Sequence, residues 1–169
     1  ADCFLGGGSV SLYAKARGYR VLCNDIAERS HIVGRALIEN DPDYSRLSAR
    51  LLLHAVRREV LGEEVDQAAM AERYPQYFPQ AIRFGIEAGR LDPRLAQFDL
   101  ARLAAALQPG RDLQFTYLGL QTLYDRYFLH HEGRRFELPQ GFFMRVAMGL
   151  ALNEIDREAR AIEFYEVLS

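Results

Sequence analysis

The sequence predicts a mainly α fold: a helical bundle-like domain with a short β-hairpin, preceded by a partial βαβ, Rossmann-like segment. Two observations predict it. Residues 39–169 carry apolar side chains at spacings of three and four, separated by short loops with Pro or Gly, which is typical of packed helices. Residues 1–38 instead combine two short apolar runs with the glycine-rich stretch FLGGGS. That pattern indicates a strand, a tight turn, a helix and a second strand.

The composition excludes several classes of protein. The chain has 169 residues, a formal charge of −2, and 49% hydrophobic and 26% charged residues, which is a globular composition. This charge gives no general attraction for nucleic acid, and no apolar run approaches the ~20 residues needed to span a bilayer. Cys3 and Cys23 are the only cysteines and lack CxxC spacing. With no recognisable signal peptide, we expect a cytoplasmic protein without a zinc site.

The first helix of the larger part is predicted from its ends. Asp41 and Pro42 have the form of an N-cap followed by proline at the first helical position, and Gly62 is a natural end. Apolar residues between them are expected to face the core: Leu47, Leu51, Leu52, Ala55 and Val56.

Three further helices are expected before residue 108. Asp66 is a candidate cap for the second helix, and Pro79 is expected to open a third that ends at Gly89. The pair Asp92–Pro93 repeats the signal of cap plus proline, so a fourth helix is expected to run to Leu107.

The last third predicts two helices around a hairpin, followed by a final helix. An apolar stripe indicates the first of them: Leu113, Tyr117, Leu120, Tyr124 and Phe128. Gly133 lies between alternating extended residues, which indicates a short hairpin. Residues 140–152 are apolar nearly all round, as in a central buried helix. Asp156 is expected to cap the final helix, with Ala159, Ile162, Tyr165 and Leu168 facing inward.

The glycine-rich turn is a candidate cofactor site. Backbone N–H groups at such a turn can approach a ligand, and an acidic residue after the next strand can bind ribose hydroxyls. Those residues are Asp2, Gly6, Gly8 and Asp25. The pattern D-x-F-x-G-x-G with a later N-D resembles the opening of S-adenosylmethionine-dependent methyltransferases, particularly adenine-specific DNA methylases. The resemblance covers residues 1–38, and a simple tight turn is the alternative.

The catalytic loop of such methylases, D/N-P-P-Y/F, stacks its aromatic ring on a flipped base. The nearest match is DPDY at residues 41–44, where Asp43 replaces the second proline. The stretch also lies close after Asp25 and has the form of a helix N-cap. We therefore expect no methyl transfer by this chain.

From about residue 37 onward the chain resembles another family. The residues that carry this resemblance are LIENDPDYSRLSARLLLHAVRREVLG, YFPQAIRFGIEAGRLDPRLAQFDLARLAAAL and TYLGLQTLYDRYFLHHEGRRFELPQGFFMRVAMGLALNEIDREARAIEFYEVLS. They are similar to the N-terminal helical region of the large (α) subunit of class I ribonucleotide reductase. Polar positions within them add specificity: Gln121, Asp125, Arg126, Pro139, Gln140 and Arg145.

This second resemblance implies a subunit that reduces ribonucleotides to deoxyribonucleotides for DNA synthesis. It implies ATP or deoxynucleotide effectors, a radical supplied by a small subunit, and a homodimer of the parent large subunit. In that family the reacting cysteines, the catalytic Asn and Glu and the relay tyrosines belong to a barrel that begins just after the position of Ser169. We therefore expect a fragment, cut at both ends, that contains no catalytic residue and is inactive alone.

One effector-binding residue is implied by the same resemblance. In the family, the first helix after the ATP-cone domain contributes a basic residue to the effector site. Arg57 and Arg58 stand there, and Arg58 is the better match; the alternative is that both remain solvated and offset the helix dipole. No metal site is expected, because His31 and His54 stand apart and the neighbours His130–His131 would point to opposite faces of a strand.

The interpretation that accounts for most residues has two parts. Residues 1–38 are expected to be a partial methyltransferase-like nucleotide-binding segment, and residues 39–169 a reductase large-subunit helical domain. The alternatives are a fragment of an S-adenosylmethionine-dependent DNA adenine methyltransferase, for which DNA would be a partner, and a noncatalytic helical module.

Overall fold

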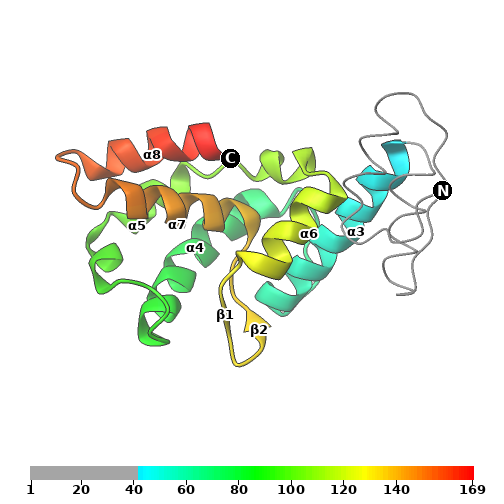
Figure 1. The fold of residues 1–169 in the computed structure, drawn as a ribbon, viewed down its shortest axis with the longest axis horizontal. Helices are drawn as coiled ribbons and strands as arrows, with labels where there is room; N and C mark the ends of the chain where they lie inside the picture. The colour runs from blue at the N-terminus through cyan, green and yellow to red at the C-terminus, as the bar shows by residue number, and fades with distance from the viewer. Residues whose placement is uncertain (1–41) are drawn as a thin grey trace, which may run out of the picture. The chain divides into compact units, whose positions relative to one another are not determined.

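The computed structural model describes residues 42–169, and the chain divides into two compact units between Arg50 and Leu51. The second unit, Leu51–Ser169, holds most of the described residues. These residues are mainly α-helical with one two-stranded hairpin, which confirms the predicted class for this part of the chain (Figure 1). The expected βαβ segment lies outside the described residues. None of the described helices is both long and apolar enough to cross a membrane.

Helix α3 spans Pro42–Leu61 and ends before Gly62, as predicted. Gly62 has a φ of +77°, the left-handed conformation that glycine adopts easily at a helix end. The predicted inward face of this helix is only partly confirmed. Leu51 is 65% exposed, whereas Leu53, Val56 and Arg57 are buried. The spacing of the leucines did not predict which face of α3 is buried. The buried face includes Arg57, whose charge is paired with Asp112, 55 residues away.

Two more residues that were predicted to face the core are exposed. Leu47 is 56% exposed and Ala55 is exposed, while Leu52 is only partly buried against the core. Only Val56 of the predicted set is fully buried. The helix therefore buries a stripe displaced from the most leucine-rich one.

Helix α4 spans Met70–Glu87 without interruption, so the prediction that Pro79 opens a separate helix is wrong. Pro75 and Pro79 both lie inside it and cannot donate backbone hydrogen bonds. The helix continues because one face is buried along its length: Met70, Tyr74, Phe78, Ala81, Ile82 and Gly85. The chain leaves the helix at Gly89, where φ is +66°.

The single helix predicted from Asp92 to Leu107 is also wrong, because the chain forms two shorter ones. A 3-10 helix, η2 (Pro93–Gln97), begins after Asp92, whose side chain accepts a hydrogen bond from the Arg94 N–H at 2.8 Å. Helix α5 (Leu100–Ala105) begins after Asp99, which caps it through the Arg102 N–H. Asp99 is thus a second N-cap in a stretch where one was expected.

The stripe predicted for one helix is divided, because Leu113 lies in a separate 3-10 helix and Phe128 lies beyond the end of the following helix. A 3-10 helix, η3 (Pro109–Gln114), is followed by α6 (Tyr117–Arg126), which Thr116 caps. Leu120 is fully buried, as its place in the stripe predicts. The antiparallel strands β1 (His130–His131) and β2 (Arg134–Arg135) then form the predicted hairpin.

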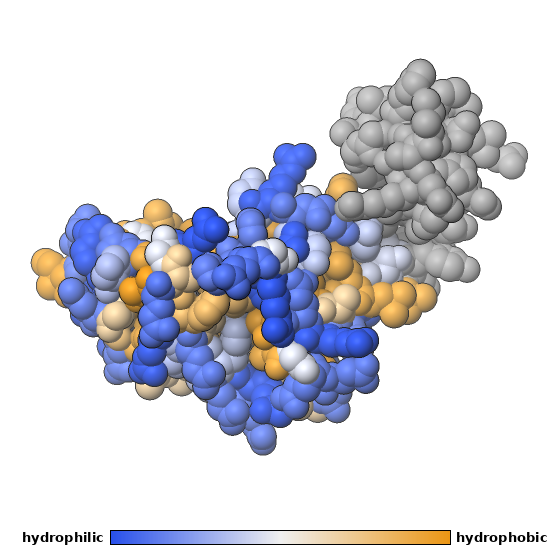
Figure 2. Space-filling model, turned by 90° about the horizontal axis from the view of Figure 1, so that it is seen from below, coloured by the Kyte–Doolittle hydropathy of each residue, from blue (hydrophilic) through white to orange (hydrophobic). Residues whose placement is uncertain are grey.

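Helix α7 (Pro139–Ala151) is the predicted central helix, and Met144, Ala147 and Met148 have no exposed surface. It packs most extensively on α8 (Arg157–Leu168), and it also contacts α4 and η3. Figure 1 shows α8 running along α7. Asp156 caps α8 through the Ala159 N–H, as predicted. On the face seen in Figure 2, hydrophilic and apolar side chains are interspersed.

Candidate functional site

Asp112 is a buried carboxylate that contacts several elements of the helical body. It lies in η3 and is 2% exposed. The Arg57 guanidinium donates to its Oδ2 at 2.9 Å, and Arg57 is itself only 4% exposed. Burying such a pair removes both charges from water, so its geometry has to be completed by further hydrogen bonds.

Tyr74 and Gln140 complete the coordination of the Asp112 carboxylate. The Tyr74 hydroxyl lies 2.9 Å from Oδ2, and Gln140 Nε2 donates to Oδ1 at 3.0 Å. The Tyr74 oxygen also accepts from the Gln140 backbone N–H at 3.3 Å. Helices α4 and α7 are therefore joined to η3 by the neutral donors Tyr74 and Gln140, whereas α3 is joined to η3 by the charge of Arg57.

The hydrogen bonds continue from Gln140 to α8 and to the loop before η3. Tyr165 on α8 donates to Gln140 Oε1 at 2.6 Å and accepts from the Gln108 N–H at 2.9 Å. At the other end, Arg57 donates to Gln67 Oε1 at 2.6 Å, and Gln67 donates to the Pro109 carbonyl at 3.0 Å. We call this set the Asp112 network: Arg57, Gln67, Tyr74, Asp112, Gln140 and Tyr165.

Burial controls the protonation of this network. It raises the pKa of the Asp112 carboxyl above its ordinary value, against the hydrogen bonds from Gln140, Arg57 and Tyr74, which lower it. Burial, followed by the nearby Asp112 charge, raises the pKa of the Tyr74 phenol well above its ordinary value. Arg57 Nε is the one buried side-chain polar atom in the described residues without a hydrogen-bond partner. The network holds helices together, and its carboxylate is already occupied by internal donors.

Arg58, the predicted effector residue, lies apart from the Asp112 network. It is exposed on α3, whereas its neighbour Arg57 is buried, so the idea that both arginines are solvated is wrong for Arg57. Arg58 lines an open surface pocket of about 690 Å³ together with His54, Ala55, Glu59, Gly62, Gly133 and Arg134. Basic side chains from α3 and from the hairpin thus share one surface.

The other predicted site residues are not brought together with Arg58 by the described structure. Asp2, Gly6, Gly8 and Asp25 lie outside the described residues. Within residues 42–169, no group of three or more His, Cys, Asp or Glu could hold a metal ion. His130 and His131 differ in burial, as expected for neighbours in a strand.

Two comparisons with protein families match different ends of the chain. Residues 113–169 match the family described as ribonucleotide reductase, all-alpha domain. Residues 1–72 match the family described as D12 class N6 adenine-specific DNA methyltransferase. Both resemblances predicted from the sequence are confirmed, and the methyltransferase match extends well beyond residue 38.

Comparison with individual proteins extends the first of these matches. A ribonucleoside-diphosphate reductase subunit alpha from Chlamydia trachomatis is 49% identical over 139 residues, which is 82% of this chain and 13% of that protein. One from Helicobacter pylori is 40% identical over 130 residues, 76% of this chain and 15% of the relative. The large subunit from Danio rerio is 34% identical over 130 residues, which is 76% of this chain and 16% of that protein. The chain therefore spans about an eighth to a sixth of the length of these relatives.

Proposed function

We propose that this chain, whose helical part is homologous to the N-terminal region of ribonucleotide reductase large subunits, is the helical region of such a subunit. In this proposal, residues 39–169 support a catalytic domain in which ribonucleoside diphosphates are reduced to deoxyribonucleotides. The subunit would act in the cytoplasm with a small subunit that supplies the radical. The observation that carries the proposal is the 49% identity over 82% of the chain.

The packing of the described residues favours a structural role. The Asp112 network joins α3, α4, η3, α7 and α8 through side chains that are mostly buried. Its members donate to and accept from one another at buried positions, which favours a structural role over contact with a substrate. Such a network fixes the arrangement of helices on which another domain can be mounted.

Arg58 is proposed as a contact for a nucleotide effector of the whole subunit. It is exposed beside His54 and Arg134, so an anionic phosphate group would meet more than one basic side chain there. Residues 1–38 are proposed as a separate, partial nucleotide-binding segment with Asp2, Gly6, Gly8 and Asp25 at its turn.

A second candidate function rests on the match of residues 1–72 to DNA adenine methyltransferases. In that case S-adenosylmethionine would bind the glycine-rich turn, and DNA would be the partner. The stretch DPDY, with Asp43 in place of the second proline, argues against methyl transfer by this chain. We therefore place this candidate second.

A chimera tests the leading proposal. In the Chlamydia trachomatis subunit alpha, the matched region is replaced by residues 39–169 of this chain, and ribonucleotide reduction is measured with the cognate small subunit. We expect the folded chimera to keep most of the parent's turnover. A matched chimera carrying Asp112→Leu should lose it, because the buried donors lose their acceptor. A soluble, cooperatively folded chimera without turnover would refute the proposal.

A further inference from the structure

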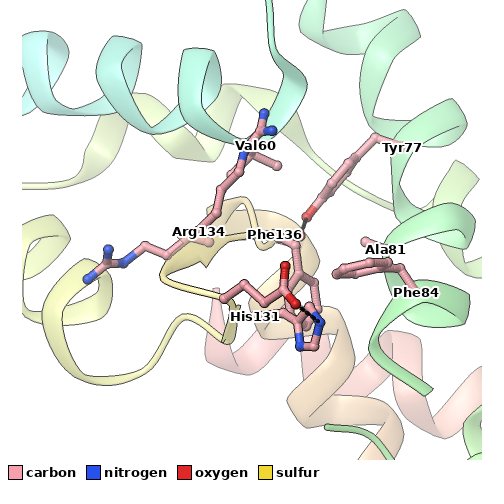
Figure 3. Close-up of a pocket in the computed structure, with 9 residues that line it drawn as sticks. Val60, Tyr77, Ala81, Phe84, His131, Arg134 and Phe136 are labelled. Carbon is pink, nitrogen blue, oxygen red and sulfur yellow. Dashed lines mark hydrogen bonds and ion pairs between the residues drawn. The ribbon is translucent and has the colours of Figure 1, made fainter. Parts of the chain in front are cut away.

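A pocket of about 600 Å³ lies between the β-hairpin, the end of α3 and α4, away from the Asp112 network (Figure 3). We call it the hairpin pocket. It is lined by Val60, Tyr77, Ala81, Phe84, His131, Glu132, Arg134, Arg135 and Phe136. Its volume falls within the range of small-molecule binding sites.

The apolar side of the hairpin pocket is aromatic. Phe84 on α4 is 41% exposed and meets Phe136 edge-on, with ring centroids 5.1 Å apart. The His131 ring also meets the Phe84 ring, at 5.7 Å, and Figure 3 shows the three rings converging. The Tyr77 hydroxyl is occupied, because it donates to the Phe136 carbonyl and accepts from the Leu138 N–H at 3.0 Å. An exposed ring of this kind offers a surface on which another flat ring can pack.

The polar side contains one arginine whose charge is not neutralised. Arg135 forms an ion pair with Glu59 at 4.0 Å, and its backbone N–H also donates to the Glu59 carboxylate. Its Nε donates to the Tyr124 carbonyl at 2.7 Å. Arg134 Nε donates to the Glu59 backbone carbonyl at 2.8 Å. In the described part of the chain, no carboxylate forms an ion pair with Arg134. Its guanidinium therefore contributes a positive charge at the pocket, which the Glu132 carboxylate also lines.

The turn that closes the hairpin holds a strained backbone. Glu132 has a φ of +51°, and the following Gly133 has +78°. A left-handed conformation is uncommon for Glu, and such strain persists where surrounding contacts impose it. The carboxylate of Glu132 lies 3.8 Å from His131 Nε2, which places its charge beside that ring.

From these features we propose that the hairpin pocket binds a small, flat aromatic anion. The ring packs against Phe84 and Phe136, and the acidic group pairs with Arg134. This binding shares Arg134 with the surface proposed for the effector, but it also requires Phe84 and Phe136, which do not line that surface. A carboxylate, phosphate or sulfonate on an aromatic ring meets the requirement, whereas an aromatic cation does not.

The test uses the 169-residue chain and three naphthalene probes that differ in charge: naphthalene-2-sulfonate, 2-naphthalenemethanol and 2-naphthylmethylammonium. Titrations are followed by amide chemical shifts of the hairpin and of Phe84. We expect saturable binding of the sulfonate, about threefold tighter than the alcohol, because an exposed ion pair contributes modestly. The ammonium should bind weakest. Equal affinities of the three probes, no saturation, or shifts confined to other surfaces would overturn the proposal. In a competition experiment, displacement of the sulfonate by an acidic peptide that contains phenylalanine would also overturn it.

Variants separate the ring from the charge. Phe84→Ala should weaken all three probes, by about tenfold for the sulfonate, whereas Arg134→Gln should reduce the sulfonate to the affinity of the alcohol. Arg102→Gln, an exposed arginine on α5 outside the pocket, is the matched control and should change nothing. Glu132→Gln lies at the exposed hairpin turn and should strengthen binding of the sulfonate, weaken binding of the ammonium and leave the alcohol unchanged. A sulfonate preference that survives Arg134→Gln, or that does not increase in Glu132→Gln, would refute the role of charge.

Discussion

Replacing Arg57 by Met tests the Asp112 network more sharply than any other single change. The substitution keeps an unbranched side chain of helical propensity but removes the guanidinium that pairs with Asp112 at 2.9 Å. The carboxylate, 2% exposed, then remains buried with only the neutral donors of Tyr74 and Gln140. Removing one partner of a buried ion pair costs about 3–5 kcal/mol. That is a large part of the roughly 5–15 kcal/mol that stabilises a typical domain.

The adjacent Arg58 provides the matched control, because it has the same side chain on the same helix but is exposed. Arg58→Met should change the free energy of unfolding by less than about 0.5 kcal/mol. Both variants are compared with the parent by urea unfolding at pH 7, followed by circular dichroism at 222 nm. Equal stabilities of the two variants would refute the reasoning.

A double-mutant cycle then isolates the ion pair. Asp112→Leu alone leaves Arg57, Tyr74 and Gln140 without their acceptor, so it should also be strongly destabilising. The double variant Arg57→Met/Asp112→Leu should lose less than the sum of the two, because no uncompensated charge remains. Strict additivity would show that the two charges do not interact.

Four further outcomes follow from the structure. Leu120→Asp places an unpaired charge at a fully buried position and should abolish the cooperative melting transition of the helical body. The raised pKa of Tyr74 means that the folded chain keeps this proton after the unfolded chain has lost it. The contribution of Tyr74 to stability should therefore be complete below about pH 10 and fall by about 1.4 kcal/mol per pH unit above it, and Tyr74→Phe should reduce the slope measured in urea titrations by about that amount. Glu132→Asn, which suits a left-handed turn, should raise the melting temperature, and a decrease would contradict the strain argument. S-adenosylmethionine should not shift the melting temperature, and a saturable shift of several degrees would support the methyltransferase alternative.

The sequence predicted those elements whose determinants lie within the element itself. The apolar residues of α7 and the glycine of the hairpin determine their own structure within about a dozen residues, and both predictions are confirmed. The prediction of a helix start at Pro79 is wrong for a nonlocal reason. Burial of Tyr74 and Phe78 on the same face sustains α4 through the proline. Propensity gives way to tertiary packing at such positions.

The Asp112 network was harder to predict, because its members are distant in the chain. Arg57 and Asp112 are separated by 55 residues, and nothing near either one identifies the other. Gln140 stood out only through family resemblance, and its bonds to Asp112 and Tyr165 are visible only in the structure. The apolar pattern of α3 indicated a face that does not include Arg57. Because charged side chains are usually solvated, nothing in the sequence indicated that Arg57 is buried.

Residues 39–169 are proposed to support a reductase without carrying out its reaction. The most direct measurement incubates a radiolabelled ribonucleoside diphosphate with the purified 169-residue chain, an active small subunit and reductant. The full-length relative from Chlamydia trachomatis serves as the positive control. We expect deoxyribonucleotide from the control and none from this chain. Deoxyribonucleotide formed by the chain itself would contradict the proposal.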